Sequence, residues 1–406
     1  MSTRVPQRIL VAPSGFKESL CAESVASAIA SGVRRALPGV RVDTAPIADG
    51  GEGTARTLAA ATRGTLHETT VVGPVGEPVP SHWARLGGSE RSVAVVEMAA
   101  AAGLSLVPHD RRDPGATTTY GVGQLMAAAL DAGADTILVG CGDSGTCDGG
   151  AGALQALGAR ILDVQGHEIG RGGRELIRAH HLDLTALHPR LAEVDVVLAC
   201  NPHNVLCGPS GVARVFGPQK GASPDQVDEL SAALDNWARV LERDGVAAGD
   251  VATGAGTGAS GGLGAGLAAG VGAQLRSRFD ALLDSGLSGI DLDRRIRKAD
   301  LVITAEGSID FQTPRGKVPA EVARRCQQFG VPVIALAGSL GRGAPAVHDV
   351  GIAAIASIIT VPMPLSEAVA NGERLLTDAA ERTMRMILLG GAVSARSGNR
   401  SRKKSA

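Results

Sequence analysis

The sequence predicts an α/β fold in which a doubly wound parallel sheet is interrupted by a large inserted α+β domain. Both ends of the chain alternate short apolar runs with helix-period segments, which is the rhythm of parallel strands joined by helices. The middle instead contains extended runs separated by Gly/Pro turns. A length of 406 residues accommodates two such domains, and the 44% apolar content supplies their cores.

The N-terminal part is expected to open with two strand–helix pairs. A strand at 8–12 precedes an apolar-periodic helix at 22–36, and a strand at 40–46 precedes a helix at about 53–61. The loops that follow such strands collect ligands in α/β sheets.

The middle of the chain is predicted to hold both strands and helices. Three extended runs, at 65–72, 79–86 and 92–98, favour an antiparallel arrangement. The elements expected after them are a helix at 120–132, a strand at 136–141, a helix at 150–157, strands at 159–163 and 195–200, and a helix at 224–243 capped by Ser223.

The C-terminal part returns to the strand–helix rhythm. The expected strands lie at 301–304, 331–336 and 352–358, and the expected helices at 320–329, 344–350 and 366–389. With the two N-terminal strands they make five parallel strands, for which we expect the order 2-1-3-4-5. The predicted divisions are a domain of 1–60 plus 290–390, an inserted domain of 61–289, and a disordered basic tail of 391–406.

Composition and charge argue against several functional classes. The formal net charge of −1 and the 2% aromatic content disfavour nucleic-acid binding. The six cysteines form no C-x-x-C pair, so a zinc site is not expected. Neither a signal peptide nor a membrane-spanning stretch is recognised, so we expect a reducing, cytoplasmic compartment.

The stretch DLVITAEGSIDFQTPRGK (300–317) is the most informative loop. After a buried strand it presents two carboxylates, Glu306 and Asp310, and two cations, Arg315 and Lys317. Hard oxygen ligands beside a lysine suit a metal-bound polyphosphate. A solvated acidic turn is the structural alternative.

Two N-terminal loops carry compatible groups. Lys17 lies between a strand end and a helix start, a position that suits phosphate or carboxylate binding. The sequence ADGGEGT (48–54) combines Asp49 and Glu52 with three glycines, whose amides can approach an anion. The two acids suit Mg²⁺ binding or acceptance of a hydroxyl proton.

The sequence GCGDSGTCDGGAG (140–152) has the outline of a dinucleotide fingerprint, with a formal G-x-G-x-x-G after a strand and Asp163 at the end of the next strand. Asp143 and Asp148, however, lie where pyrophosphate would bind. Unit charges ~4 Å apart repel by roughly 4 kcal/mol at an effective dielectric near 20. A metal–phosphate site or a hydroxy-acid pocket that includes Ser144 fits better, and NAD binding is the alternative.

The long loop 201–221 gathers Asn201, His203, Asn204 and Lys220 among glycines and prolines. Lys220 suits contact with phosphate or carboxylate, and His203 suits a structural role or that of a base. The chain lacks the P-loop, the protein-kinase signatures and the G-x-S-x-G elbow of hydrolases.

Seven stretches carry a family resemblance in combination. They are ADGGEGT (48–54), VVEMAAAAGL (95–104), TTTYGVGQL (117–125), DGGAGALQALGAR (148–160), VFGPQKGA (215–222), GGLGAGL (261–267) and ITAEGSIDFQTPRGK (303–317). Together they resemble the bacterial glycerate kinase family, the kinases without a P-loop, from residue 9 to about 389. The resemblance implies ATP-dependent phosphorylation of D-glycerate, Mg²⁺, and a two-domain fold with a flavodoxin-like part.

The loops and the resemblance together assign candidate roles. Asp310 or Asp49 is the base, and the other acid binds Mg²⁺ together with Glu306. Lys17, Lys220 and Lys317 are candidates for binding phosphates or the substrate carboxylate, and Lys17 is placed with Asp49 and Asp310 among the catalytic residues. Backbone amides for the nucleotide would come from Gly50, Gly51, Gly149 and Gly150. The candidates for binding the hydroxy acid are Asp143, Ser144, Asn201 and Asn204. We expect these loops to converge in one cleft, and a homodimer is compatible with the sequence.

Several loop residues depart from the family's usual pattern. Acids are missing at 14, 201 and 203, and one is gained at 143, whereas the core motifs are kept. This indicates a divergent subgroup with an altered pocket, in which transfer to the 2-hydroxyl is implied by the resemblance. The alternatives are a dinucleotide-binding oxidoreductase and a catalytically silent relative that binds a hydroxy acid.

Overall fold

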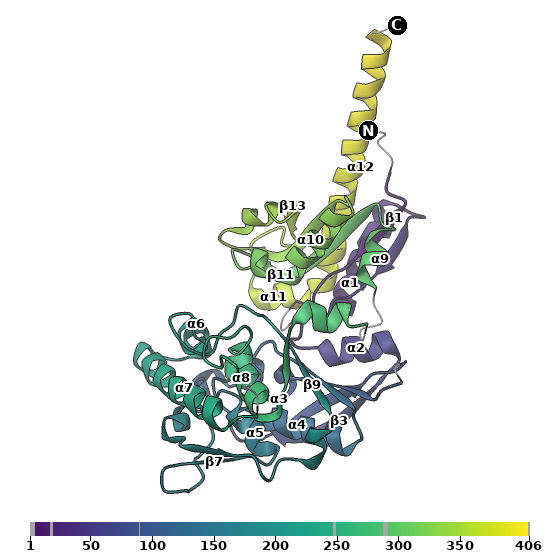
Figure 1. Cartoon of the computed structure of the whole chain (residues 1–406). Coiled ribbons are helices and arrows are strands. Elements are labelled where there is room, and N and C mark those ends of the chain that lie inside the picture. Colours follow the sequence, from purple (N-terminus) through teal and green to yellow (C-terminus); the bar gives the residue numbers. More distant parts are fainter. Residues whose placement is uncertain (1–4, 17–18, 89, 247–248, 287–290, 405–406) are drawn as a thin grey trace. The chain divides into compact units, whose positions relative to one another are not determined.

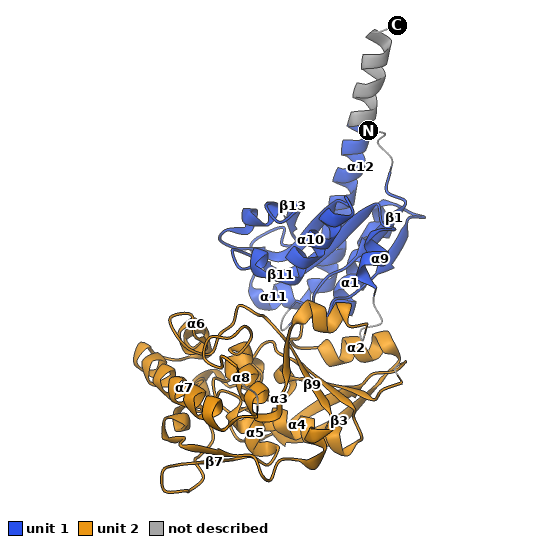
Figure 2. Cartoon of the chain, viewed as in Figure 1, with its two compact units in different colours: residues 1–48, 291–406 blue, residues 49–290 orange. Residues whose placement is uncertain are grey.

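The computed structural model describes residues 5–16, 19–88, 90–246, 249–286 and 291–404, with side chains up to residue 393. The chain forms two compact units, which Figure 2 shows in blue and orange. Unit 1 comprises Met1–Ala48 and Asp291–Ala406, and unit 2 comprises Asp49–Ile290.

Unit 1 contains a five-stranded sheet in which every neighbouring pair of strands is parallel. Its strands are β1 (Arg8–Val11), β2 (Arg41–Thr44), β11 (Leu301–Ile309), β12 (Val333–Leu340) and β13 (Ile352–Ser357). The order β13-β12-β11-β1-β2 is the predicted 2-1-3-4-5 order. The change of direction falls between β1 and β11, where doubly wound sheets bind ligands.

Helices pack on the sheet of unit 1 because their apolar residues recur once per turn. Val25, Ile29 and Val33 line one side of α1 and are fully buried. Helix α12 lies beside α1 (Figure 1). The approach is close because a Cβ at Gly32 would collide with the Thr377 carbonyl O. The helical elements are α1 (Ala22–Ala36), α9 (Leu292–Ile296), η7 (Thr313–Arg315), α10 (Val318–Gln328), η8 (Ala344–His348), α11 (Leu365–Ala370) and α12 (Gly372–Lys404).

Unit 2 contains a six-stranded mixed sheet in the order β10-β9-β6-β5-β4-β3. Its strands are β3 (Thr65–Val72), β4 (Pro78–Arg85), β5 (Val93–Glu97), β6 (Thr136–Gly140), β9 (Asp195–Cys200) and β10 (Gln274–Ser277). The pairs β3–β4 and β4–β5 are antiparallel, as predicted, but β5 pairs with β6 in parallel. The parallel strands β5, β6, β9 and β10 therefore share one carboxyl edge. A separate two-stranded sheet consists of β7 (Arg160–Leu162) and β8 (His181–Asp183).

The helices of unit 2 enclose a core built mainly of aliphatic side chains. Trp237 is its largest fully buried side chain, and Ser223 begins the helix α7 with a capping box. The helical elements are α2 (Thr54–Thr62), α3 (Met98–Ala102), η1 (Leu104–Leu106), η2 (His109–Arg111), α4 (Tyr120–Asp131), α5 (Ala151–Ala156), η3 (Gly173–Arg178), η4 (Pro189–Ala192), α6 (Val212–Phe216), η5 (Pro218–Lys220), α7 (Pro224–Asp244), α8 (Ala259–Val271) and the π-helix η6 (Asp280–Asp284).

The structure differs from the predicted divisions in two places. Unit 2 begins at Asp49 rather than at 61, because α2 packs on β3, β4 and β5. The tail predicted to be disordered from 391 continues as helix α12 to Lys404, and residues 405–406 lie outside the described chain.

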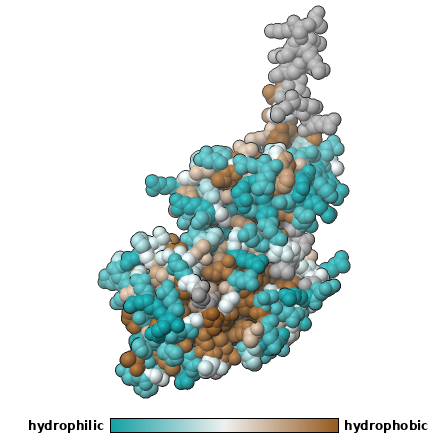
Figure 3. All heavy atoms as spheres, viewed as in Figure 1, coloured by the Kyte–Doolittle hydropathy of each residue, from teal (hydrophilic) through white to brown (hydrophobic). Residues whose placement is uncertain are grey.

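The visible surface of unit 1 is mainly hydrophilic, and apolar side chains gather over part of unit 2 (Figure 3). Among the helices that the structure describes, none combines the length and the apolar character needed to cross a membrane.

Candidate active site

Two carboxylates and one ammonium group meet at the carboxyl end of β11 in unit 1. Lys317 Nζ lies 3.3 Å from Glu306 Oε1 and 3.6 Å from Asp310 Oδ1. It also donates a hydrogen bond of 3.3 Å to the Ser308 carbonyl O. The side chains of Lys317, Glu306 and Asp310 are 25%, 17% and 24% exposed, so the cluster is sheltered but reachable from solvent.

The strand itself positions the first acid. The prediction that Glu306 lies in a loop is wrong, because β11 continues to Ile309 and Glu306 pairs with Ala337 of β12. Alternate residues of a strand face the same side, which places Glu306 and Ser308 together. Asp310 follows in a tight turn, in which its Oδ1 accepts a hydrogen bond of 2.8 Å from the Gln312 N–H.

The cation is positioned by the start of the next helix. Lys317 is the residue that precedes α10, and Pro319 occupies its first turn. Gly316 adopts φ 99°, a left-handed conformation that favours glycine, between η7 and α10. This turn brings Lys317 back toward Ser308 and Glu306.

The chemistry of this cluster fits a magnesium nucleotide. Mg²⁺ is commonly held by one or two carboxylates together with substrate phosphates, and a lysine binds phosphate as a point charge. Glu306 and Asp310 supply the carboxylates and Lys317 supplies the cation. Within the described residues, no group of three or more His, Cys, Asp or Glu side chains forms a metal-binding cluster. Two carboxylates beside one ammonium group suit an ion that shares its coordination with phosphate.

A second acidic segment, Asp49–Gly53, is called here the acidic turn. It lies against the carboxyl ends of β6 and β9 in unit 2. A Cβ at Gly50 would lie 3.3 Å from the Ala199 carbonyl O, and one at Gly142 would lie 2.5 Å from Gly51 Cα. The glycines thus allow close packing of backbone on backbone.

The predicted anion-binding role of Gly50 and Gly51 is not supported by their geometry. The Gly50 N–H donates to Thr54 Oγ1 at 3.0 Å, and the Gly51 N–H donates to Asp49 Oδ1 at 2.9 Å. Both glycines are buried. Their amides therefore stabilise the acidic turn itself.

Asp143 joins the acidic turn from the loop after β6. Its Oδ2 accepts a hydrogen bond of 3.2 Å from the Glu52 N–H, and its backbone has the uncommon left-handed φ of 54°. Asp49 and Asp143, two of the predicted site residues, thus belong to one cluster at the edge of the unit 2 sheet. Both are partly exposed.

Lys220 lies behind Ser144 in the same unit. Its side chain is buried, with 3% exposure, and its Nζ donates to Ser144 Oγ at 2.8 Å and to the Thr146 carbonyl O at 2.7 Å. No ion pair links Lys220 to a described carboxylate. The predicted direct contact of Lys220 with a nucleotide is therefore unsupported, because its ammonium group faces the protein. The charge instead favours an anion at the partly exposed Ser144 hydroxyl.

Gly149 and Gly150 are also structural. The Gly149 N–H donates to the Gly261 carbonyl O at 3.0 Å, and the Gly150 N–H donates to Asp148 Oδ1 at 3.2 Å. The predicted binding of a nucleotide by these amides is not supported by this geometry, because both N–H groups already have partners in the protein. Asp148 is fully buried, which raises its pKa, and hydrogen bonds from Thr119, Gly150 and Gly152 oppose that effect.

The dinucleotide alternative does not fit the fold. A dinucleotide fingerprint requires the strand that ends at Asp163 to lie parallel in the same sheet as β6. That strand, β7, instead pairs antiparallel with β8 in the separate two-stranded sheet. Asp163 accepts hydrogen bonds from the Gln165 and His167 N–H groups and stabilises a turn.

The remaining predicted residues occupy a turn after β9 or fall outside the described chain. Asn201 Oδ1 accepts a hydrogen bond of 3.1 Å from the His203 N–H, and the Asn204 N–H donates to the Asn201 carbonyl O at 3.1 Å. Asn201 and Asn204 are partly exposed at the carboxyl edge of the unit 2 sheet. Lys17 lies outside the described residues.

Two residues that sequence analysis did not single out also contact the acidic turn. Arg278, just beyond β10, donates from Nη1 to the Asp49 carbonyl O at 3.4 Å. Glu97, the last residue of β5, accepts hydrogen bonds from the Gly53 and Ala55 N–H groups. The one signal for Glu97 is a carboxylate at the end of an otherwise apolar strand.

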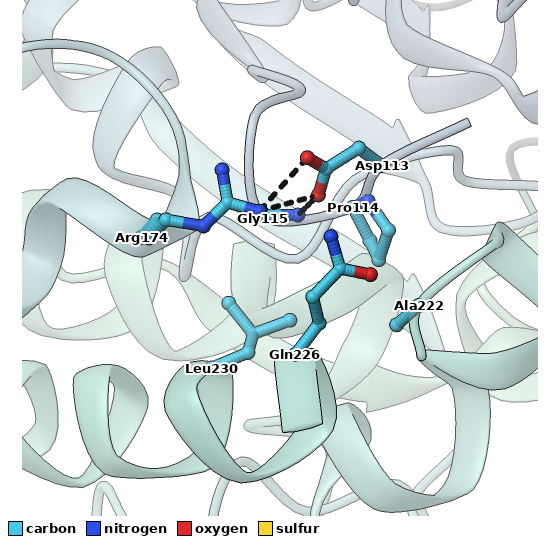
Figure 4. A pocket seen from close by; sticks show the side chains of 7 residues that line it. All are labelled: Asp113, Pro114, Gly115, Arg174, Ala222, Gln226 and Leu230. Carbon is cyan, nitrogen blue, oxygen red and sulfur yellow. Dashed lines mark hydrogen bonds and ion pairs between the residues drawn. The ribbon is translucent and has the colours of Figure 1, made fainter. Parts of the chain in front are cut away.

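A shallow surface pocket in unit 2, which has no enclosed volume, contains none of the predicted site residues. Figure 4 shows Arg174 and Asp113 facing each other at its edge, with hydrogen bonds of 2.9 and 2.8 Å to the two carboxylate oxygens. Because these charges neutralise each other, we assign the pocket no role in catalysis.

Comparison with known proteins identifies the family. The sequence model of the Glycerate kinase family matches residues 9–388. A glycerate kinase of Bacillus subtilis (strain 168) is 44% identical over 380 residues, which are 94% of this chain and 96% of that protein. A glycerate 2-kinase of Escherichia coli (strain K12) is 43% identical over 361 residues, which are 89% of this chain and 93% of that protein.

The chain belongs to the glycerate kinase family. A crystal structure of a Salmonella typhimurium LT2 protein assigned as glycerate kinase 2 has 41% identity and a TM-score of 0.77, covering 95% of this chain and 99% of that one. The predicted resemblance and the mixed α/β fold with parallel sheets are thereby confirmed. Membership of the glycerate kinase family also confirms the predicted enzyme class, a kinase, and implies the use of ATP.

Proposed function

We propose that this protein transfers the γ-phosphoryl group of ATP to the 2-hydroxyl of D-glycerate, with Mg²⁺ as cofactor. The observation that carries the proposal is the pair of carboxylates, Glu306 and Asp310, bridged by Lys317 at the carboxyl edge of a doubly wound sheet. Family membership and the name of the Escherichia coli relative, a glycerate 2-kinase, support the acceptor.

The unit 1 cluster is suited to the triphosphate. Lys317 would exchange its present carboxylate partners for γ-phosphate oxygens, because the ammonium group is partly exposed. The candidate ligands of Mg²⁺ are Glu306 and Asp310 in unit 1 and Asp49 in unit 2, and the ion would neutralise phosphate charge. Positioning and charge neutralisation supply most of the catalysis of phosphoryl transfer.

A carboxylate is needed to accept the proton of the attacking hydroxyl. Asp310 and Asp49 are the two candidates, since each is a partly exposed acid near the carboxyl ends of parallel strands. A carboxylate oxygen of the base would accept the proton as the bond between the substrate oxygen and the γ-phosphorus forms, while the bond from that phosphorus to the bridging oxygen breaks and ADP leaves. The acid that is not the base would remain available as a metal ligand.

Ser144 is suited to the carboxylate of the substrate. The buried ammonium group of Lys220 donates to its Oγ at 2.8 Å, which orients the hydroxyl proton away from Lys220 and adds positive potential. Asp143, Asn201 and Asn204 lie at the ends of β6 and β9 and would bind hydroxyl groups of the acid.

The proposal is tested by an ADP-release assay with D-glycerate, L-glycerate, lactate and tartronate, followed by ³¹P NMR of the product. We expect Mg²⁺-dependent ADP release with D-glycerate and the formation of 2-phosphoglycerate. A silent relative would release no ADP with any of these acids. A 3-phosphorylated product would overturn the assignment of the 2-hydroxyl.

A further inference from the structure

Glu97 is a buried carboxylate that the proposed chemistry does not use. It ends β5, and only 1% of the residue is exposed. Its Oε2 accepts a hydrogen bond of 3.2 Å from the Gly53 N–H, and its Oε1 accepts a short hydrogen bond from the Ala55 N–H. Burial keeps Glu97 away from substrates, so it acts through the backbone that it contacts.

That backbone is the start of α2. The first N–H groups of a helix have no partners within the helix and are commonly capped by a side chain at the N-cap position. Here the N-cap residue is Gly53, which has φ 89° and no side chain to offer. Glu97 therefore caps α2 from a neighbouring strand, with a charge that also favours the positive end of the helix.

The cap also holds the acidic turn, because Gly53 is its last residue. Arg278 binds the Asp49 carbonyl O at the beginning of the turn, Asp143 binds the Glu52 N–H in the middle, and Glu97 binds its end. Of these three contacts, that of Glu97 is the one made by a buried carboxylate.

We propose that Glu97 is a positioning residue for phosphoryl transfer, which holds Asp49 in its working position by capping α2. The inference rests on the proposed function, in which Asp49 is the base or a metal ligand. In this role Glu97 binds neither substrate nor metal. Its contribution depends on accepting two backbone hydrogen bonds at the same time.

The charge state of Glu97 makes the proposal measurable. Its pKa is raised from 4.5 to about 7, mainly by burial and in part by Glu52, against the opposing effects of the two N–H donors and Arg56. The pKa of His82 on β4 is lowered mainly by burial, and Arg56 lowers it further. Below pH 7 Glu97 gains a proton, and one of its oxygens then faces an N–H as a donor. We therefore expect kcat to fall as the pH is lowered below 7.

The experiment compares wild type, Glu97→Gln and Glu97→Asp by kcat, KM and pH profile from pH 6 to pH 8.5. In Glu97→Gln an amide NH₂ faces a backbone N–H, so we expect kcat at pH 8 to fall at least tenfold and its rise around pH 7 to disappear. Glu97→Asp keeps the charge on a shorter side chain. Relative to Glu97→Gln it should recover part of kcat and part of the rise in kcat around pH 7. The matched control is Asp163→Asn, another buried acid that accepts two backbone hydrogen bonds, which should leave kcat and the profile unchanged.

Two further measurements separate positioning from general loss of structure. If Glu97 acts through the acidic turn, Glu97→Gln should cost little additional kcat in an Asp49→Asn background. Hydrogen exchange at the amides of residues 53–55 should accelerate in Glu97→Gln, independently of activity. Wild-type kcat and profile in Glu97→Gln, or full additivity with Asp49→Asn, would overturn the inference. An inactive wild type would instead contradict the proposed function, and the exchange rates would still test the cap.

Discussion

Lys317 and Glu306 form a 3.3 Å ion pair at the point where β11 leaves the sheet of unit 1. The pair is formed because the strand continues through Glu306 while Gly316 turns the chain back toward it. Asp310 lies 3.6 Å from the same ammonium group, so Lys317 contacts both acids. An exchange of this cation from carboxylate to phosphate is the simplest way for the cluster to bind a nucleotide.

Replacement of that cation should affect nucleotide use. In Lys317→Ala we expect kcat/KM for ATP to fall by roughly 10²–10³, the typical effect of removing one preorganised electrostatic contact to a transition state. Lys317→Arg should retain part of the activity, since the charge remains. Steady-state kinetics with varied ATP tests this, and an unchanged kcat/KM in Lys317→Ala would remove Lys317 from the site.

Lys220 should affect the acid rather than the nucleotide. Lys220→Met keeps most of the side-chain volume and removes the donor to Ser144 Oγ and the buried charge. We expect KM for D-glycerate to rise about tenfold, the loss of one charge-assisted hydrogen bond, with KM for ATP unchanged. Ser144→Ala should show the same selectivity. An effect on ATP alone would contradict this assignment.

Close packing of the acidic turn on the loop after β6 should be intolerant of a methyl group. A Cβ at Gly142 would lie 2.5 Å from Gly51 Cα, so Gly142→Ala should destabilise the fold by about 1–3 kcal/mol and lower kcat. Gly249→Ala is the matched control, because among the described residues other than its chain neighbours no atom lies within 4 Å of its added Cβ. Urea denaturation and the ADP-release assay test both variants, and equal behaviour would contradict the packing.

Glu97 should make stability depend on pH in an unusual direction. Its pKa is raised from 4.5 to about 7 in the folded state. Between these values the folded protein binds more protons than the unfolded chain, so this group's contribution to stability falls as pH rises. Relative to Glu97→Gln, wild type should lose roughly 3 kcal/mol between pH 4.5 and pH 7. Urea midpoints at several pH values measure this, and parallel pH dependences of the two proteins would contradict it.

Sequence patterns over short stretches predicted the strands of unit 1 and one group of candidate site residues. The strand order of unit 1 follows from alternating apolar runs, and Glu306, Asp310 and Lys317 lie in one short stretch whose residue types reveal their chemistry. The burial of Lys220 could not be predicted, because its partner Ser144 is 76 residues away in sequence. Only the fold shows that a lysine in a loop is buried.

Glycines were the least predictable residues. Gly50, Gly51, Gly149 and Gly150 were expected to present amides to an anion, yet each amide has a partner in the protein. The glycines indicate that the backbone at these positions lies close to another group, but they do not show whether that group is a ligand or another part of the protein. Glu97 was missed for a related reason, since an acid that ends an apolar strand has no partner that sequence can show.

The most direct test of the proposed mechanism is ³¹P NMR of ATP, Mg²⁺ and D-glycerate with wild type and with Asp310→Asn. An asparagine at 310 can still accept the Gln312 hydrogen bond, so the turn should persist and circular dichroism should be unchanged. We predict 2-phosphoglycerate and ADP with wild type, and a rate at least 10³-fold lower with the variant if Asp310 is the base, on the order of what a positioned proton acceptor contributes. Turnover at the wild-type rate in Asp310→Asn would contradict a catalytic role for this cluster.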